Sequence, residues 1–359
     1  MQLGVCVASH INDIGYVVRA EELGFSHAWL ADSQMLWSDC YATLALAATR
    51  TSRINLGTGV AVTGTRPPPV TASSIATINA LAPGRTFLGV GAGNTALRVM
   101  GQPPQRIAAF DRYLRTLKPL LRGDEALYRQ GNVDVPIRHI MQETGFVDFQ
   151  HRIPMYVSGF GQRSLGLAGQ HGDGAVVGVS NPQGVALTRR HIEAGAQQAG
   201  RALKRGDYLV TSLCAVSILD PGEKADSPRI RNECGAMAMA TVHYAYDQWR
   251  NFGQEPPPHL RDMWPEYTAL LAAVPEDRVH QRIHAGHNCW VIPEEEQFVT
   301  GSLIEATCMV GTQDQLLERL AALYDAGLDQ VMILPAFAPR YENLERVGRE
   351  LIPQLQRLR

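Results

Sequence analysis

The feature that most constrains the fold is a regular alternation of short apolar segments with longer amphipathic ones. Short apolar runs are typical of strands buried on both faces, and the longer segments between them have helical periodicity. The eight expected strands cover residues 3–7, 27–31, 54–62, 86–90, 153–157, 174–179, 208–218 and 330–334. This order predicts an α/β fold, a (β/α)8 TIM barrel in which helices connect parallel strands.

The chain is longer than such a barrel needs. It has 359 residues, against the roughly 250 of a typical barrel. Two irregular stretches, 123–150 and 220–306, account for the excess. We therefore expect one domain over residues 1–359, with 220–306 inserted between strands seven and eight. Because this insertion falls at the catalytic face of a barrel, we expect it to form a lid or a substrate wall.

Composition excludes several classes of protein. The formal net charge is −2, with 45% hydrophobic and 19% charged residues, which is typical of a globular enzyme rather than a nucleic-acid binder. Apolar runs stop well short of the ~18 residues that a membrane span needs, and the first residues lack a signal peptide's pattern. We expect a cytoplasmic protein. The six cysteines are scattered without C-x-x-C spacing, so we expect no metal site.

An open, doubly wound sheet is the rival architecture. Gly89, Gly91 and Gly93 superficially match a dinucleotide-binding fingerprint. However, no helix with a third glycine in register follows, and no acidic residue closes the next strand at the expected spacing. The barrel is therefore the better interpretation.

Residues 153–178 read as a strand, a glycine-rich turn, a helix that starts near Arg163, and a second strand. The turn contains Ser158, Gly159, Gly161 and Gln162. A helix N-terminus offers free N–H groups and the positive end of its dipole, and glycines let the backbone approach an anion. On this pattern alone, a phosphate site and an ordinary crossover are equally good interpretations.

Five stretches match one known pattern in order and span nearly the whole chain. They are AEELGFSHAWLADS (20–33), TSRINLGTGVAV (51–62), APGRTFLGVGAGN (82–94), SGFGQRSLGLAGQHGDG (158–174) and MVGTQDQLLERLAALYDAGLDQVMILP (309–335). Together they resemble the luciferase-like superfamily of flavin- and deazaflavin-dependent oxidoreductases. Two further stretches, DSQMLW (32–37) and VTASSIATINAL (70–81), are similar to its methylenetetrahydromethanopterin reductase-like subgroup.

The resemblance implies a TIM barrel with a flavin or deazaflavin ring over the carboxyl ends of the strands. It also implies a non-proline cis peptide after strand three, near Gly59, and a phosphate on the turn at 158–163. The cofactor-binding residues that it implies are Gly59, Val60, Ala61, Asn94, Ser158, Gly159, Gly161, Gln162, Arg163, Gly178 and Val179.

Two departures from the family pattern bear on the chemistry. Where the family's sugar-phosphate dehydrogenases have a catalytic histidine and an acid, this chain has Ser33 and Asn94. Neither is a general acid or base near neutral pH, although Asn94 can hydrogen-bond a ring or a substrate. The reductase-like subgroup usually has Asn-Pro-x-Thr-Arg-His-Pro after strand three, whereas residues 63–69 read Thr-Gly-Thr-Arg-Pro-Pro-Pro. This difference argues against the usual reductase substrate.

His10 and Asn94 are the candidate catalytic residues. The candidate substrate contacts are Gln34, Trp37, Thr63, Arg66, His287 and Trp290. Structural roles stay open beside these: His10 as a loop histidine, Trp37 as a packing residue, and Arg66 as a bridge to a carboxylate. The acidic run 294–296 is interpreted as a solvent-exposed face.

These features together favour a two-component monooxygenase that uses reduced FMN and O2 on a small organic substrate. A separate flavin reductase would be its partner, because no second fingerprint for NAD(P)H is present. A peroxyflavin also tolerates the missing acid and base. The alternatives are an F420-dependent reductase or dehydrogenase that transfers a hydride, and a non-catalytic flavin-binding protein. We expect a homodimer or a homotetramer.

Overall fold

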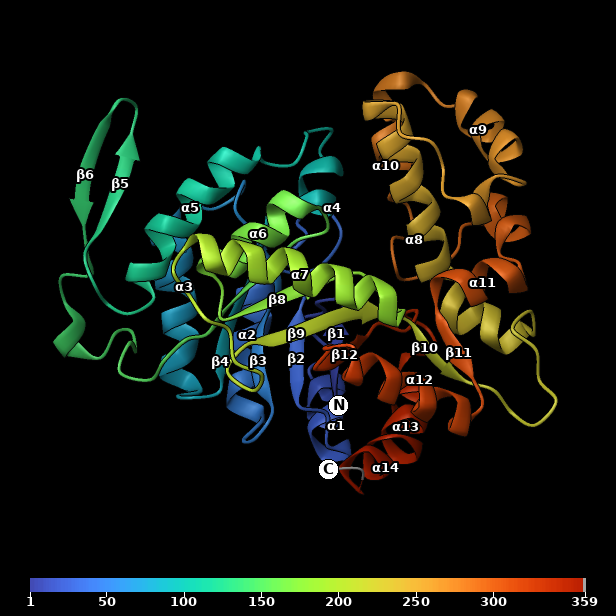
Figure 1. Cartoon of the computed structure of the whole chain (residues 1–359), viewed down its shortest axis with the longest axis horizontal. Helices are drawn as coiled ribbons and strands as arrows, with labels where there is room; N and C mark the ends of the chain where they lie inside the picture. The colour runs from blue at the N-terminus through green and yellow to red at the C-terminus, as the bar shows by residue number, and fades with distance from the viewer. Residues whose placement is uncertain (358–359) are drawn as a thin grey trace.

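The fold is a closed barrel of eight parallel strands, which confirms the predicted class (Figure 1). The computed structural model describes residues 1–357. Around the barrel the strands follow the order β1-β12-β9-β8-β7-β4-β3-β2. Their bounds are β1 Gln2–Val7, β2 His27–Leu30, β3 Asn55–Val62, β4 Thr86–Gly91, β7 Met155–Ser158, β8 Gly174–Val177, β9 Leu209–Cys214 and β12 Gln330–Ile333.

Helices surround the barrel, and local capping residues set several of their ends. α1 ends at Gly24, whose φ of 90° lies in the left-handed region that favours glycine. Asp39 begins α2 by accepting hydrogen bonds from the N–H groups of Tyr41 and Ala42. The helices of the barrel are α1 Gly15–Leu23, α2 Cys40–Arg50, α3 Pro68–Leu81, α4 Asn94–Arg98, α5 Ile107–Leu120, α6 Gln162–His171, α7 Pro182–Gln198, α12 Gln313–Asp325, α13 Arg340–Glu350 and α14 Ile352–Arg357.

Large side chains fill the interior of the barrel. The rings of Trp29 and Phe87 lie 4.4 Å apart, and Trp29 Nε1 donates to Gln330 Oε1 at 3.0 Å. A Cβ at Gly57 would lie 2.3 Å from Phe87, so only glycine leaves room for that ring. The barrel is therefore a packed core, and a ligand must bind at its mouth, beyond the carboxyl ends of the strands.

Two segments differ from their predicted boundaries. The predicted strand 208–218 is in fact two strands, because the chain leaves the barrel at Ala215 and β10 (Val216–Ile218) pairs in parallel with β11 (Met309–Gly311). The stretch 123–150 contains the antiparallel hairpin of β5 (Ala126–Gln130) and β6 (Val133–Ile137). A continuous apolar run does not reveal where a strand changes its pairing partner.

The segment between β10 and β11 is a helical insertion beside the barrel (Figure 1). Its helices are α8 Pro228–Phe252, α9 Trp264–Ala272, α10 Val279–Arg282 and α11 Gly301–Thr307. It has a hydrophobic cluster of its own, which includes Ile230, Tyr267 and Phe298. No helix among the described residues has both the length and the apolar character required to cross a membrane.

The acidic run 294–296 is not a solvent-exposed face throughout, so that interpretation is wrong at its centre. Glu295 is only 1% exposed. It accepts a hydrogen bond from Arg282 Nη1 at 2.9 Å and lies 2.9 Å from His243 Nε2. Because Arg282 ends α10, this buried cluster ties the segment that follows, residues 283–290, to α8.

Candidate active site

The predicted phosphate turn lies at the end of β7 and begins α6. Gly161 stands directly before the helix, and the first N–H groups of α6, those of Gln162 and Arg163, have no acceptor among the described residues. A Cβ built on Gly161 would meet nothing within 4 Å, so the space in front of the helix is open. Arg163 is exposed and forms no ion pair with the described part of the chain. These groups fit a phosphate.

The predicted ring site lies beside this turn. The peptide bond between Gly59 and Val60 is cis, as the resemblance implied, and the register of β3 against β4 shifts there. A Cβ at Gly91 would lie 2.8 Å from Val60 Cγ2 and 3.3 Å from Ser158 Cβ. The bulge in β3, the end of β4 and the phosphate turn therefore meet at one point of the mouth.

Phe160 and Gly178 connect the phosphate turn to its neighbours. Phe160 is 56% exposed, and a Cβ at Gly178 would lie 2.8 Å from its ring, so the end of β8 closely approaches the turn. The ring of Phe160 lies 6.3 Å from that of Tyr244 on α8. Val179 is held by Ser212, whose hydroxyl accepts from its N–H at 3.0 Å. The insertion thus borders the proposed phosphate position.

Three predicted substrate contacts bond to the protein itself. Arg66 Nη1 donates to Asp32 Oδ2 at 2.6 Å, and its other nitrogen contacts Asp39 at 3.0 Å, so it bridges carboxylates. Gln34 Nε2 donates to the carbonyl of Ala96 at 2.8 Å. Thr63 Oγ1 donates to the carbonyl of Gly91, the last residue of β4, at 3.2 Å. These side chains fix loops at the mouth, and none is free in this structure to bind a substrate anion.

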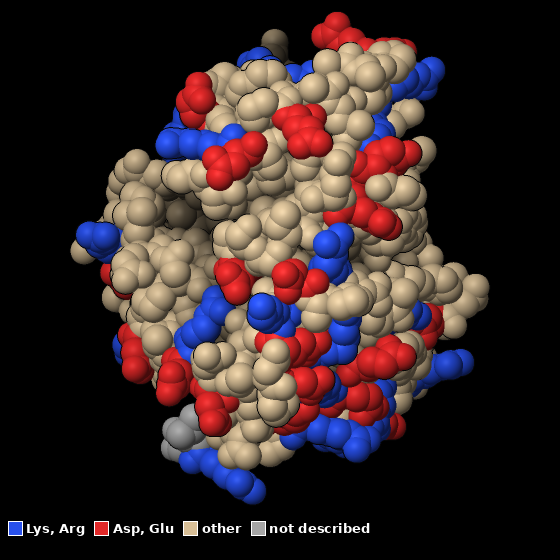
Figure 2. Space-filling model, turned by 90° about the vertical axis from the view of Figure 1, so that its right-hand side faces the viewer, with Lys and Arg blue, Asp and Glu red and all other residues tan. Residues whose placement is uncertain are grey.

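A pocket of about 290 Å³ opens at the carboxyl ends of β1 and β2. Its lining residues are Ala8, Ser9, His10, Leu36, Trp37, Ser38, His284, Gly286, His287, Cys289, Trp290 and Phe337. They come from the loops after β1, β2 and β12 and from the insertion. Figure 2 shows a hollow, with few charged side chains around it, on the side of the molecule that the insertion forms.

Hydrogen bonds and ring contacts join these four segments. Trp37 Nε1 donates to Cys289 Sγ at 3.3 Å, and its ring lies 6.0 Å from that of His287. The N–H of Phe337 donates to the carbonyl of Cys289 at 2.8 Å. The ring of His10 stacks on Phe337 at 5.8 Å. Four predicted residues, His10, Trp37, His287 and Trp290, therefore meet in one pocket, whereas sequence analysis missed Cys289 and Phe337.

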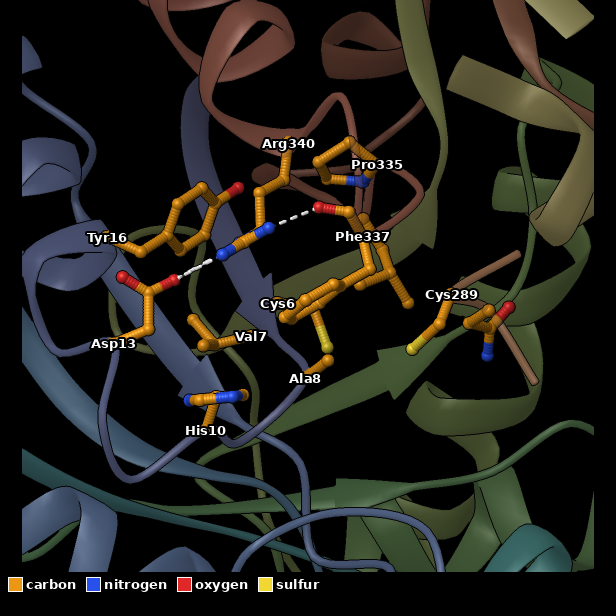
Figure 3. A pocket seen from close by; sticks show the side chains of 12 residues that line it. Cys6, Val7, Ala8, His10, Asp13, Tyr16, Cys289, Pro335, Phe337 and Arg340 are labelled. Carbon is orange, nitrogen blue, oxygen red and sulfur yellow. Dashed lines mark hydrogen bonds and ion pairs between the residues drawn. The ribbon is translucent and has the colours of Figure 1, made fainter. Parts of the chain in front are cut away.

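A smaller cavity of about 20 Å³, with room for one water molecule, shares His10, Cys289 and Phe337 with this pocket. Figure 3 shows Asp13 and Arg340 on one side of it and Cys289 on the other. Arg340 Nη2 donates to Asp13 Oδ2 at 2.6 Å. Burial raises the pKa of the Cys6 thiol to about 12, so this side chain is not a thiolate nucleophile. The ion pair anchors the loop after β12.

The predicted catalytic residue Asn94 lies apart from His10, at the start of α4 and beside the insertion. The next residue, Thr95, has its hydroxyl 3.5 Å from His287 Nε2. Asn288 Nδ2 is 3.0 Å from the same nitrogen. No cluster of three or more potential metal ligands occurs within residues 1–357.

Two pocket histidines are held neutral. Burial lowers the pKa of His284 to about 4, and burial with the nearby His284 and His243 lowers the pKa of His287 to about 3. Because these values lie below that of an unfolded histidine, ~6.5, the unfolded chain binds more protons. The contribution of these two neutral histidines to the free energy of unfolding is therefore fully present above about pH 6.5. It is lost as the pH falls from there toward about 4 for His284 and about 3 for His287.

We expect acid to loosen the insertion. Between pH 6.5 and 4.5, each of these histidines should lower the free energy of unfolding by on the order of 1 kcal/mol per pH unit. Thermal unfolding across this range measures the effect. His287→Asn should flatten the pH dependence, whereas His259→Ala, at an exposed position of the same insertion where burial lowers the pKa less strongly, should flatten it less. Equal slopes in the wild type and His287→Asn would contradict the assignment.

The structure is a TIM barrel with an open glycine-rich turn after β7, a bulge in β3 and a pocket at its mouth. Residues 10–330 match the family model described as luciferase-like monooxygenase, and the chain belongs to this family. The chain is 26% identical over 347 residues to the 5,10-methylenetetrahydromethanopterin reductase of Archaeoglobus fulgidus, covering 95% of both chains.

Solved structures show the same fold. The coenzyme F420 dependent tetrahydromethanopterin reductase from Methanopyrus kandleri superposes with a TM-score of 0.69 at 23% identity, over 99% of both chains. The oxygenating constituent of 3,6-diketocamphane monooxygenase from Pseudomonas putida, in complex with FMN, superposes with a TM-score of 0.62 at 16% identity, over 99% of both chains. One of these two proteins is F420 dependent and the other is in complex with FMN, so the fold alone does not distinguish the two cofactors.

The prediction of a two-component monooxygenase with reduced FMN and O2 is wrong. The similarity over nearly the whole chain is to a reductase, and the solved tetrahydromethanopterin reductase is F420 dependent. The prediction rested on Ser33 and Asn94, which replace an acid–base pair found elsewhere in the family. However, the pocket takes its imidazoles from other segments, namely His10, His284 and His287. Homo-oligomerisation and a cytoplasmic location stay predictions.

Proposed function

We propose that the protein is an F420-dependent oxidoreductase that transfers a hydride between the deazaflavin and a small organic substrate. One observation carries the proposal, the similarity to a 5,10-methylenetetrahydromethanopterin reductase over 95% of both chains. Residues 63–69 lack the subgroup's asparagine and histidine. We therefore expect a substrate other than a methanopterin.

The residues at the mouth fit such a cofactor. When bound, F420 would supply or accept the hydride. The N-terminus of α6 and Arg163 would hold its phosphate, while the Gly59–Val60 bulge, Asn94 and Ser158 would border its ring. Gly161, Gln162 and Arg163 are exposed, so a chain that continues beyond the phosphate, as in F420, can pass into solvent. This opening supports F420 over FMN.

The loops and the insertion would handle the substrate. The pocket of about 290 Å³ is large enough to hold a small molecule. If a carbonyl or imine is reduced, its carbon gains the hydride and its oxygen or nitrogen gains a proton. His10, at the end of β1, is the exposed imidazole of the pocket and is assigned the contact with that atom.

Turnover under anaerobic conditions tests this function. The protein is mixed with reduced F420 and, in turn, methylenetetrahydromethanopterin and a panel of cyclic ketones and imines. We expect substrate-dependent formation of oxidised F420, followed by its absorbance, without oxygen. Oxygen uptake is measured in parallel with reduced FMN. Substrate-dependent oxygen uptake with FMN, together with no F420 turnover, would contradict the proposal.

A further inference from the structure

The lining of the 290 Å³ pocket has no permanently charged side chain among the described residues. Among the residues that the structure describes, no lysine, arginine, aspartate or glutamate lines it. His284 and His287 are neutral near pH 7, because burial lowers the pKa of each well below that of free histidine. A charged substrate would therefore lose its hydration in this pocket without gaining a counter-ion, which costs free energy.

Most polar side chains of the lining already have partners in the protein. Ser9 Oγ donates to the carbonyl of Ala31 at 2.8 Å, and Ser38 Oγ accepts from the N–H of Ile11 at 3.2 Å. The indole N–H of Trp37 is bonded to Cys289. His284 Nδ1 lies 2.6 Å from the carbonyl oxygen of His280 and donates to it. These hydrogen bonds fix the shape of the pocket and occupy the groups that form them.

His10 is the exposed histidine of the lining, whereas the unpartnered Nδ1 of His287 is buried. The side chain of His10 is exposed at the mouth, and its ring contacts Phe337 at an interplanar angle of 28°. Neither ring nitrogen forms a hydrogen bond to any residue in 1–357. An imidazole can donate or accept, so the exposed His10 offers the pocket an uncommitted polar contact.

Aromatic rings provide much of the remaining surface. Trp37 and His287 form one pair, and His10 and Phe337 form another with nearly parallel planes. Trp290, which is 61% exposed, adds a further ring to the lining. Flat aromatic walls favour a planar ligand, because rings gain offset-stacked or edge-to-face contacts.

We infer that the substrate is an uncharged, planar and largely apolar ring compound with one polar group, which His10 contacts. This inference rests on the proposed function only in taking the pocket as the substrate site. A substrate of this kind differs from a sugar phosphate or a carboxylic acid, each of which needs a charged group in its binding site. The residue that sets the preference for a polar group is His10, and the preference against charge comes from the whole lining.

Three matched probes test the inference: indane, 1-indanone and 1-oxoindane-5-carboxylate. Their dissociation constants for the purified full chain are measured by ligand-observed NMR, with and without F420. We expect 1-indanone to bind about five- to tenfold more tightly than indane, the gain from one hydrogen bond. The carboxylate should bind at least about tenfold more weakly than 1-indanone.

Variants identify the residue responsible. His10→Ala should bring the ratio between indane and 1-indanone to about one, and His10→Gln, which keeps a hydrogen-bonding group, should restore part of it. His259→Ala, at an exposed site elsewhere in the insertion, should keep the full ratio. Equal or tighter binding of the carboxylate, a ratio that persists in His10→Ala, or binding of no probe would overturn the inference. Failure of F420 itself to bind would instead contradict the proposed function.

Discussion

Gly161→Asp should abolish cofactor binding while the protein stays folded. The new carboxylate would stand at the N-terminus of α6, where the proposed phosphate lies, and two like charges about 4 Å apart repel by about 4 kcal/mol. The dissociation constant should therefore rise on the order of a thousandfold. Gly161 has φ −108° and ψ 162°, which any residue adopts, and aspartate is a good helix cap. Titration with F420, followed by its fluorescence, measures the loss.

Gly161→Asn is the matched control for charge. It has nearly the same shape and also caps the helix, so it should weaken binding far less than the aspartate does. Thermal unfolding of both variants should match the wild type. Unchanged F420 affinity in Gly161→Asp would place the phosphate elsewhere. Gly159 is less suitable for this test, because a Cβ there would lie 2.8 Å from the backbone of Ser164 and distort the turn.

Glu295→Ala should destabilise the insertion by about 3–5 kcal/mol, because it leaves a buried cation without its partner. Arg282 and His243 both bond to the Glu295 carboxylate, and the side chain of Glu295 is 1% exposed. Residues 283–290, which carry His284, His287 and Cys289 into the pocket, follow Arg282 directly. We therefore expect the binding of pocket ligands to weaken together with stability.

Chemical denaturation, followed by the fluorescence of Trp249 and Trp264 in the insertion, measures this effect. The control is Glu294→Ala, one residue earlier in the same acidic run but exposed, which should change stability by less than about 0.5 kcal/mol. If the two variants are equally stable, the buried cluster does not hold the insertion in place.

The barrel could be predicted from sequence because its strands are short, buried on both faces and separated by helical periodicity. The point where β9 ends and β10 begins could not, because Cys214, Ala215 and Val216 form one apolar run. Burial of Glu295 was equally hidden, since an acidic triplet reads as surface. Its partners, His243 and Arg282, lie 52 and 13 residues away in sequence.

The same distinction between local patterns and long-range contacts decides which parts of the candidate site could be predicted. The implied cofactor residues lie in contiguous motifs, and the structure brings Val60, Gly91 and Ser158 together. The pocket combines segments from both ends of the chain, so no local pattern could reveal that Cys289 and Phe337 join Trp37 and His10. For Arg66 the structure shows the bridging role, because Asp32 and Asp39 bind it, although the sequence did not reveal these partners in another loop.

The prediction of a monooxygenase failed for a related reason. It treated two loop positions as the whole supply of acid–base groups, whereas the mouth of a barrel collects side chains from all its loops and from the insertion. The replaced positions at Ser33 and Asn94 therefore do not reveal which cofactor is bound.

Competitive titration of the purified protein with F420 and FMN, each oxidised and reduced, tests the central claim most directly. We predict saturable binding of F420 in the micromolar range, weak displacement by FMN in either state, and loss of F420 binding in Gly161→Asp. Tight binding of reduced FMN with no measurable affinity for F420 would contradict the account.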